Sequence, residues 1–354
     1  MAVTSTPTTR SRFSFIDIVG TAELKDTPMR ILLTGASGWL GQTLAPRLAR
    51  DGHTVIGLDP VPSPTTQIVG SIADRDCVRR ALRDYEIEAV IHSGALHKPH
   101  VETHERSAFI ATNVQGTLNL LEEAVAPGAK VSRFLMTSTT SLMISKEIRA
   151  GREGGAAKAI WIDEEMAPLL PRNIYGVTKL SAEHLCRLFH ELYGLPALIL
   201  RTARFFPEED DMAHAMAQTA DNAKANELLF RRATVEDMAE AHVAALAKAP
   251  EIGFDTFIIC AQTPFSRDDC AELIADAPAV VTRLFPHYRE IYAQLGWTMF
   301  GSIDRVYDSS KAARRLGFTC QTGFAEKLRE LARQNGPETD LAGRRETGGL
   351  LRRP

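Results

Sequence analysis

Tyr175 and Lys179 are the two residues whose types and spacing most directly suggest catalysis. They lie four residues apart, and on a helix this spacing places both side chains on one face. A phenol has an ordinary pKa of about 10 and is a poor base near neutrality, but a neighbouring ammonium group lowers that pKa. The pair could therefore take a proton from a substrate hydroxyl and return it in the reverse direction. Many helices carry the same spacing as a packed tyrosine and a solvated lysine, so this interpretation needs support from elsewhere in the chain.

A glycine-rich turn near the start of the chain provides that support. It follows the apolar run Met29–Thr34 and precedes a helical pattern, which is the context of a dinucleotide-binding turn rather than of an ordinary one. The first two glycines let the backbone approach a pyrophosphate, and the third lets helix and strand pack closely. The helix that follows supplies free N–H groups and a positive dipole end. The residues expected to contact the dinucleotide are Gly35, Ser37, Gly38, Trp39, Leu40 and Gly41.

Asp59 ends the next apolar run and predicts which dinucleotide binds. A carboxylate at this place can accept hydrogen bonds from the adenosine ribose and would repel a 2′-phosphate. The residues that follow, Pro60, Val61 and Pro62, include no arginine to hold such a phosphate. The alternative is an aspartate that only stabilises the turn. We therefore expect NAD rather than NADP.

A bound nicotinamide would give the Tyr175 and Lys179 pair a defined reaction. Tyr175 would take the hydroxyl proton while the carbinol carbon loses a hydride to the cofactor, whose positive charge further favours the phenolate. Lys179 would also hold the nicotinamide ribose.

The elements that must position these residues alternate along the chain. Apolar runs typical of strands (29–34, 54–58, 89–92, 134–137 and 197–200) are separated by helical patterns (40–50, 76–85, 105–126 and 175–193). This alternation predicts an α/β fold, a doubly wound parallel sheet of the Rossmann type with helices on both faces. Ligands of such sheets bind at the carboxyl ends of the strands.

The pattern changes after about residue 200, which predicts two unequal parts. We expect residues 29–200 to form mainly the NAD-binding domain and residues 201–334 mainly a smaller substrate-binding lobe, with a strand at 254–261, two further helical patterns and an element at 308–316. Three glycines in 150–157 suggest a mobile loop near the site. Residues 1–28 are expected to be a disordered leader, and the polar residues 335–354 a disordered tail.

The composition is that of an ordinary globular protein. Of 354 residues, 44% are hydrophobic and 24% are charged, and the net charge of -3 gives no reason to expect nucleic acid or an anionic membrane as partner. No apolar run approaches the roughly 20 residues that cross a bilayer. The five cysteines are scattered, which is typical of buried thiols in a reducing compartment, so we expect a cytoplasmic protein.

The motifs together resemble the extended short-chain dehydrogenase/reductase family, also called the NAD-dependent epimerase/dehydratase family. The resemblance runs from about Met29 to Ala332. It is carried, in family order, by residues 34–41, 90–95, 113–117, 134–140, 175–179, 235–237, 310–311 and 316–318.

The resemblance implies further site residues and a partner. It implies that Thr139 binds the reacting oxygen as a third catalytic residue, with Ser138 beside it near the substrate and Thr137 beside it near the cofactor, although a merely polar strand end is the alternative. It also implies that the helices 109–126 and 182–193 pair across a twofold axis as a homodimer. The remaining cofactor contacts that it implies are Ser71, Ile72, Ser93, Gly94 and Ala95.

Departures from the family pattern bear on the substrate. Arg204 stands where sugar-nucleotide epimerases usually carry asparagine, Phe230 replaces an arginine used on the diphosphate, and His97 replaces a lysine of some 4-epimerases. Arg204 could fork onto a carboxylate of a smaller substrate or form a structural salt bridge. His97 is expected to contact substrate. Pro99 interrupts any helix that would align His97 with the two nearby histidines, so no metal is expected.

These observations predict an NAD-dependent enzyme that transfers a hydride at a carbinol or carbonyl carbon of a small hydroxylated substrate, in the sugar or sugar acid class. One alternative is an NAD-dependent sugar or nucleotide-sugar epimerase or dehydratase, which regenerates NAD in each turnover. A second alternative is a non-catalytic NAD-sensing protein on the same fold.

Overall fold

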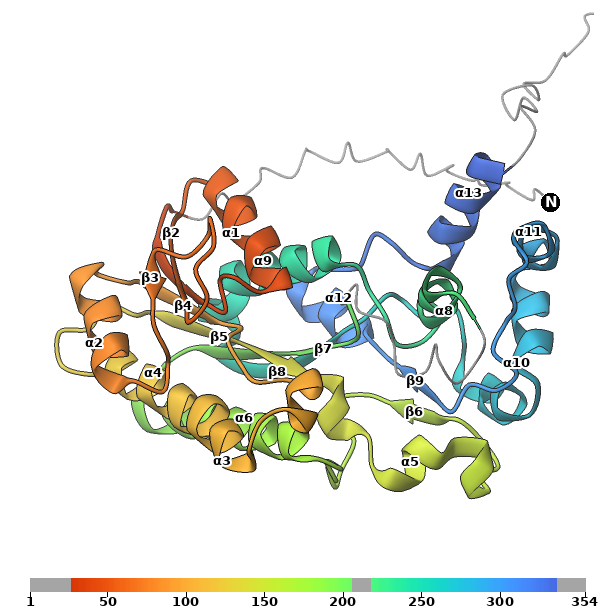
Figure 1. Ribbon diagram of the computed structural model, residues 1–354, viewed down its shortest axis with the longest axis horizontal. Helices are drawn as coiled ribbons and strands as arrows, with labels where there is room; N and C mark the ends of the chain where they lie inside the picture. The colour runs from red at the N-terminus through yellow and green to blue at the C-terminus, as the bar shows by residue number, and fades with distance from the viewer. Residues whose placement is uncertain (1–26, 206–217, 336–354) are drawn as a thin grey trace, which may run out of the picture.

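Seven parallel strands form the central sheet of the computed structural model, which describes residues 27–205 and 218–335 (Figure 1). Their order is β3-β2-β1-β4-β5-β7-β8, so the chain winds outward in both directions from β1 and the predicted doubly wound fold is confirmed. The crevice outside the carboxyl ends of β1 and β4 is the place where such sheets bind ligands. The strands are β1 (Arg30–Thr34), β2 (Thr54–Asp59), β3 (Ile68–Val69), β4 (Ala89–His92), β5 (Arg133–Thr139), β7 (Ala197–Thr202) and β8 (Phe254–Ile259).

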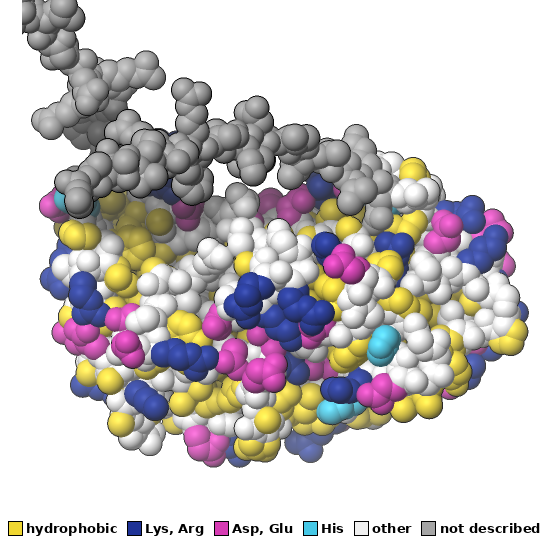
Figure 2. All heavy atoms as spheres, turned by 180° about the vertical axis from the view of Figure 1, so that it is seen from behind, with side chains coloured by type: hydrophobic (Ala, Val, Ile, Leu, Met, Phe, Trp, Pro, Cys, Tyr) yellow, Lys and Arg dark blue, Asp and Glu magenta, His cyan; other side chains and the backbone are white. Residues whose placement is uncertain are grey.

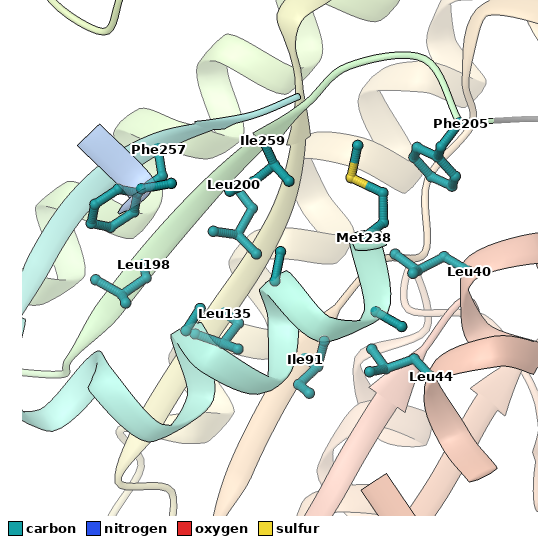
Figure 3. Close-up of a cluster of buried hydrophobic side chains, with 14 of the residues drawn as sticks. Leu40, Leu44, Ile91, Leu135, Leu198, Leu200, Phe205, Met238, Phe257 and Ile259 are labelled. Carbon is teal, nitrogen blue, oxygen red and sulfur yellow. The ribbon is translucent and has the colours of Figure 1, made fainter. Parts of the chain in front are cut away.

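Alternating side chains of the strands build one hydrophobic core on each face of the sheet. Leu33, Ile91 and Leu135 point to the first face, where they pack with α1 (Trp39–Arg50) and α9 (Val235–Ile252). Figure 3 shows this cluster, with Leu44 and Met238 reaching the sheet from the two helices. Leu32, Val90, Phe134 and Ile199 belong to the second core, under α2 (Arg75–Asp84), α4 (Gly116–Ala124) and α6 (Ile174–Tyr193). Both faces are covered, as near-continuous apolar strands require.

Two strands extend further than the apolar pattern predicts. The sequence places their ends at Thr137 and Leu200, but β5 and β7 continue to Thr139 and Thr202, which are register partners. Their last residues are polar and buried because the ladder continues and Thr202 donates a side-chain hydrogen bond of 2.9 Å to the Ser138 carbonyl. The sheet therefore extends to the level of the candidate catalytic residues.

The predicted single helix over 105–126 is wrong in detail. The structure divides it into α3 (Arg106–Phe109), a π-helical segment η2 (Ile110–Gln115) and α4, which ends at Ala124. A π-helical turn inserts an extra residue per hydrogen-bonded ring, and such turns are frequent at functional sites. Here the turn contains the buried Asn113.

A second, smaller core lies beside the sheet (Figure 1). It gathers the two-stranded sheet of β6 (Ile160–Ile162) and β9 (Arg305–Tyr307) with α10 (Cys270–Leu284), α11 (Tyr288–Leu295) and α13 (Phe324–Asn335). Residues 228–230, which follow α8 (Ala220–Glu227), also belong to it. Residues after 200 also serve the main sheet, since β8, α9 and α12 (Ser310–Leu316) belong to its layers. The predicted element at 308–316 is α12, preceded by β9.

The predicted loop at 150–157 is partly helical. Ala150 ends α5 (Lys146–Ala150), and Gly151–Gly154 form a 3-10 turn. Gly151 has a φ of 51°, and a Cβ atom there would lie 2.9 Å from the Asp304 Cβ. Glycine thus lets the end of α5 pack directly against the residue that precedes β9.

The predicted leader and tail lie almost entirely outside the described residues. The described helices include none long and apolar enough to span a membrane. All five cysteines are free thiols, and four of them are buried. Basic and acidic side chains are interspersed over the face seen from behind in Figure 2.

A buried ion pair ties α6 to the sheet. The Arg201 guanidinium on β7 donates hydrogen bonds of 3.1 and 2.7 Å to the two carboxylate oxygens of Glu183, and both side chains are less than a tenth exposed. Ser138 on β5 donates a third bond of 2.5 Å to Glu183. The carboxylate therefore holds together one helix and two strands, one helical turn after Lys179.

We predict that Glu183→Ala lowers the free energy of unfolding by about 3–5 kcal/mol, because it leaves the Arg201 charge buried without its carboxylate. The matched control is Glu191→Ala, which removes an exposed ion pair with Arg187 on the same helix and should cost less than about 1 kcal/mol. Denaturant unfolding of both variants measures the difference. Equal losses in the two variants would show that the buried pair contributes no more than the exposed one.

Candidate active site

The glycine turn after β1 has the geometry of a phosphate-binding cradle. Gly35 has a φ of 73°, and a Cβ atom there would lie 2.7 Å from the Gly94 nitrogen. A Cβ atom at Gly41 would lie 2.3 Å from the Gly35 carbonyl oxygen. The turn is therefore packed tightly between the end of β4 and α1. Glycine is needed at position 35 to avoid a clash with the backbone of Gly94, as well as to leave room for a ligand.

The N-terminus of α1 fits a pyrophosphate. Its N-cap residue, Gly38, makes no side-chain capping bond, and the first turn contains no acidic residue. The first N–H groups and the positive dipole end of this twelve-residue helix are thus uncapped by any side chain of the helix's own first turn. Trp39 is half exposed here, whereas the Leu40 side chain is buried in the core, which limits Leu40 to a backbone contact with a cofactor.

Asp59 holds the turn together at the end of β2. Its carboxylate accepts hydrogen bonds from the backbone N–H groups of Ser37 (3.2 Å) and Val61 (2.8 Å). The Ser37 hydroxyl in turn donates to the Val61 carbonyl oxygen and lies 2.6 Å from the Thr66 hydroxyl. The structural role that the sequence left open for Asp59 is thus present. A carboxylate has about four acceptor sites, so a ribose contact remains compatible with these two bonds.

The loop after β4 is fixed against the end of β1. The Ser93 hydroxyl donates 2.6 Å to the Thr34 carbonyl, and the Gly94 N–H donates 3.0 Å to the Thr34 hydroxyl. Gly94 and the half-buried Ala95 therefore border the glycine turn, where the sequence predicts the cofactor. Ser71 and Ile72 lie on the β3 side, where Ile72 is buried against Gly116 and the Ser71 hydroxyl accepts a bond from the Ala73 N–H.

Tyr175 and Thr139 meet at the carboxyl end of β5. The Thr139 hydroxyl lies close enough to the Tyr175 phenol to lower its pKa, and Thr139 also accepts 3.1 Å from the Ser141 N–H. Gly176 permits this approach, because a Cβ atom there would lie 2.8 Å from the Pro171 Cβ and 3.4 Å from the Leu142 Cα. The Asn173 side chain caps the helix by accepting 2.9 Å from the Gly176 N–H.

The environment of Tyr175 corrects one expectation. Burial raises the pKa of Tyr175 to about 12, and the influence that lowers it is the nearby Thr139 hydroxyl rather than the Lys179 ammonium. The phenol is therefore protonated near neutral pH. In this form it is ready to donate a proton to a carbonyl oxygen, and it needs an added positive charge nearby to act as a base.

Lys179 is buried, with 2% of its surface exposed. Burial lowers the pKa of Lys179 to about 8, and the Glu183 carboxylate opposes that shift. Lys179 also lies close enough to His92 to help lower the pKa of that imidazole to about 3, although burial is the larger cause. An ammonium is thus held inside the protein, one turn from Tyr175.

The two other strand-end hydroxyls serve the scaffold. The Thr137 hydroxyl lies 2.7 Å from His242 Nε2 on α9, and the buried Ser138 hydroxyl donates to Glu183 on α6. The predictions of a side-chain cofactor contact for Thr137 and a substrate contact for Ser138 are therefore not supported. Neighbouring side chains of a strand point to opposite faces of the sheet. Counting residues from Phe134 along the sequence did not show which face each hydroxyl takes.

Asn113 is a site residue that the sequence motifs did not single out. Its amide group accepts 2.8 Å from the Leu96 N–H and donates 2.8 Å to the Leu96 carbonyl and 3.0 Å to the Thr178 hydroxyl. It thereby joins the loop after β4 to α6 between Tyr175 and Lys179. In the sequence, Asn113 is the first residue of the run 113–117, which contributes to the family resemblance. That resemblance did not predict a function for the Asn113 side chain.

His97 begins a row of three histidines. The ring centroids of His97 and His100 are 4.5 Å apart, and those of His100 and His104 are 5.0 Å apart. Burial, aided by His100, lowers the pKa of His97 to about 4, so the ring is neutral at physiological pH. Among the described residues no group of three His, Cys, Asp or Glu side chains is arranged to hold a metal ion.

Arg204 lies beside a buried carboxylate. Its Nε is 3.5 Å from Oε2 of Glu227, and its side chain is 26% exposed. The sequence left a substrate contact and a structural salt bridge open for this residue. The contact with Glu227 supports a structural salt bridge, and the exposed part of the side chain leaves a substrate contact open.

We predict that Lys179→Met abolishes turnover but raises the free energy of unfolding at pH 7. The pKa of this lysine in the folded protein, about 8, lies below the ordinary value of 10.5, so burying the ammonium destabilises the fold at pH 7 by roughly 3 kcal/mol at most. The wild type recovers this stability as pH rises from about 8 to 10.5, so the advantage of the variant should shrink over that range. Unfolding at several pH values measures it.

The exposed Lys248→Met variant is the control, because it should change stability by less than about 0.5 kcal/mol at every pH. A Lys179→Met protein that is less stable than wild type at pH 7 would show that the lysine stabilises the fold.

Comparisons with known proteins agree with this geometry. A model of the NAD dependent epimerase/dehydratase family matches residues 31–260. The low-salt glycan biosynthesis protein Agl12 of Haloferax volcanii is 31% identical over 195 residues, which make up 50% of this chain and 57% of that protein. The dTDP-glucose 4,6-dehydratase of Neisseria meningitidis is 28% identical over 202 residues, or 51% of this chain and 56% of that protein. The chain thus spans little more than half the length of these curated relatives.

Solved structures share the fold over most of the chain. The UDP-glucose 4-epimerase of Thermotoga maritima has a TM-score of 0.60 at 22% identity, covering 86% of this chain and 99% of the other. A mutated uronate dehydrogenase has a TM-score of 0.58 at 20% identity, covering 88% of each chain. Identities this low establish the architecture and leave the reaction open.

Proposed function

The chain belongs to the NAD dependent epimerase/dehydratase family, and from that premise we propose that it is an NAD-dependent oxidoreductase acting on a small hydroxylated substrate, a sugar or a sugar acid. The observation that carries the proposal is that Tyr175 and Thr139 lie beside each other at the carboxyl edge of the sheet, one helical turn from the buried Lys179. The uncapped N-terminus of α1 supports NAD as the cofactor.

Each residue of the pair has a separate task in this mechanism. Bound NAD accepts or supplies the hydride at the substrate carbon. Thr139 orients the substrate oxygen, and Tyr175 exchanges a proton with that oxygen as the carbon changes between alcohol and ketone. Lys179 places a buried positive charge one helical turn from this exchange, where it would hold the nicotinamide ribose.

Departures from the family pattern favour net oxidation or reduction over the alternatives within the family. The departures at Arg204 and Phe230 alter the expected diphosphate contacts. An epimerase remains the second candidate, because several proteins that share the fold are epimerases.

We expect purified protein and NAD to accumulate NADH with a subset of sugars or sugar acids, followed at 340 nm. Tyr175→Phe should lower kcat by about 10²- to 10⁴-fold, because it removes the group that exchanges the proton. Tyr193→Phe, at the exposed end of the same helix, is the control and should keep the wild-type rate.

Two results would argue against this proposal. Tyr175→Phe turning over at a near wild-type rate would exclude the proposed proton transfer. Substrate consumed with no net NADH would instead indicate an epimerase that regenerates its cofactor.

We further propose a homodimer in which α6 pairs with its counterpart, together with the α3–α4 segment. Large apolar side chains are exposed on these helices, among them Ile110 (48%), Leu188 (45%) and Leu192 (63%). Leu188 and Leu192 are one turn apart and present a stripe on one helix face. Burial in a helix–helix interface would remove this apolar area from water.

The double substitution Leu188→Glu and Leu192→Glu should convert the dimer to a monomer in analytical ultracentrifugation, since it places charges in the apolar interface. Leu284→Glu, at the exposed end of α10, should leave the dimer intact. A wild-type protein that sediments as a monomer would rule the interface out.

We also propose that the protein works in the cytoplasm. All five cysteines are free thiols, a state that reducing compartments maintain. Fractionation of the native host tests this location.

A further inference from the structure

A chain of buried hydrogen bonds runs through His92, the last residue of β4. His92 and Thr34 are register partners at the ends of β4 and β1, and His92 Nδ1 lies 2.8 Å from the Thr34 hydroxyl. On the other side of the ring, Nε2 lies 3.0 Å from the Thr117 hydroxyl on α4. The chain continues at both ends, because Thr34 accepts 3.0 Å from the Gly94 N–H and Thr117 donates 2.7 Å to the Asn113 backbone carbonyl. It therefore joins the loop after β4 to the π-helical turn.

The contacts at the two ends fix the direction of the whole chain. A carbonyl oxygen only accepts, so the single hydrogen of the Thr117 hydroxyl is used on Asn113, and His92 donates to Thr117 from Nε2. An N–H group only donates, so the Thr34 hydroxyl accepts from Gly94 and has its own hydrogen for His92 Nδ1. His92 is therefore neutral and carries its proton on Nε2. This form agrees with burial, which lowers the pKa of the imidazole to about 3.

The same chain holds both ends of a short loop, residues 94–96. Gly94 is bound to Thr34 at the first end. At the second end the Asn113 side chain accepts 2.8 Å from the Leu96 N–H and donates 2.8 Å to the Leu96 carbonyl. Every donor from Gly94 to the Asn113 carbonyl points the same way, so each bond polarises the next one and strengthens it.

This loop packs directly against the glycine turn. A Cβ atom at Gly35 would lie 2.7 Å from the Gly94 nitrogen, and a Cβ atom at Gly94 would lie 3.0 Å from the Gly35 nitrogen. Interiors packed this closely transmit displacements, so a shift of Gly94 changes the support of the Gly35 backbone. The His92 side chain is 1% exposed and can act on a ligand in the turn only through these neighbours.

We propose that His92 is a positioning residue for the cofactor: the hydrogen-bond chain through it fixes residues 94–96 against the glycine turn and so sets the affinity for NAD. This inference needs NAD as the cofactor and does not need the proposed hydride transfer. Thr117 gives access to it, because His92 and Thr34 separate Thr117 from Gly94 in the chain. A substitution at Thr117 therefore reaches the loop by way of His92 or Asn113.

The test measures NAD binding to the full-length protein by calorimetry, without substrate. Thr117→Val keeps the size of the side chain and leaves the His92 Nε2–H without its acceptor, so the dissociation constant for NAD should rise by roughly 5- to 30-fold. Thr117→Ser restores the hydroxyl and should return the constant to within about twofold of wild type. In hydrogen exchange of the ligand-free protein, residues 94–96 should lose protection in Thr117→Val and keep it in Thr117→Ser.

The matched control is Thr282→Val on α10. The Thr282 hydroxyl donates 2.6 Å to the Pro278 carbonyl, four residues earlier, and so makes the same helix bond as Thr117 makes to Asn113. This variant should change neither the dissociation constant for NAD nor the exchange of residues 94–96. An equal loss of NAD affinity in Thr282→Val and Thr117→Val would overturn the inference, since it would reflect general destabilisation.

A second measurement uses the wild-type protein and does not depend on the folding of any variant at Thr117. Nitrogen NMR of the histidine rings distinguishes the two neutral tautomers, with the His92 signals assigned by their loss in His92→Asn. His92 should remain neutral, with its proton on Nε2, from about pH 5 to 8. A proton on Nδ1, or titration of His92 within this range, overturns the inference because the chain would then not run through the ring as described.

The results separate this inference from the proposed reaction. An NAD affinity of Thr117→Val within about twofold of wild type overturns the inference even if NADH is formed from a sugar. A loss of affinity that Thr117→Ser restores supports the inference even if no sugar is oxidised, in which case the proposed hydride transfer fails alone.

Discussion

The meeting of Tyr175 with Thr139 is the contact on which the site depends, and several constraints exist to produce it. Gly176 lets the start of α6 approach Leu142, while Asn173 caps the same helix end. Further along, Glu183 fastens α6 to β5 and β7 through Ser138 and Arg201. A helix fixed at both places can hold a phenol beside a strand-end hydroxyl.

The charges of the molecule are arranged by depth around this contact. Beneath it, Lys179 is buried with Glu183 close by and the neutral His92 at its other side. Beside it, arginines surround Glu227. The dipole of α1 adds a positive end at the carboxyl edge of the sheet, which favours an anionic cofactor there although the net charge of the whole chain is -3.

Much of the fold was predictable because its signals are local. The apolar runs and the glycine turn located the strands and the first βαβ unit, and the four-residue spacing of Tyr175 and Lys179 placed both on α6. The failures share a cause. The polar ends of β5 and β7, the π-helical turn at Asn113 and the helical end of the 150–157 segment are set by hydrogen bonds and packing with residues far away in the chain.

The sequence by itself determined the fold class, the glycine turn and the candidate catalytic pair, since each depends on residue types a few positions apart. Only the tertiary structure decided that Thr137 and Ser138 contact His242 and Glu183, and that burial raises the pKa of Tyr175. It also decided that Arg204, Arg231 and Arg232 meet at Glu227. Burial and the pairing of charges depend on which surfaces meet in space, and spacing along one chain carries no measure of that.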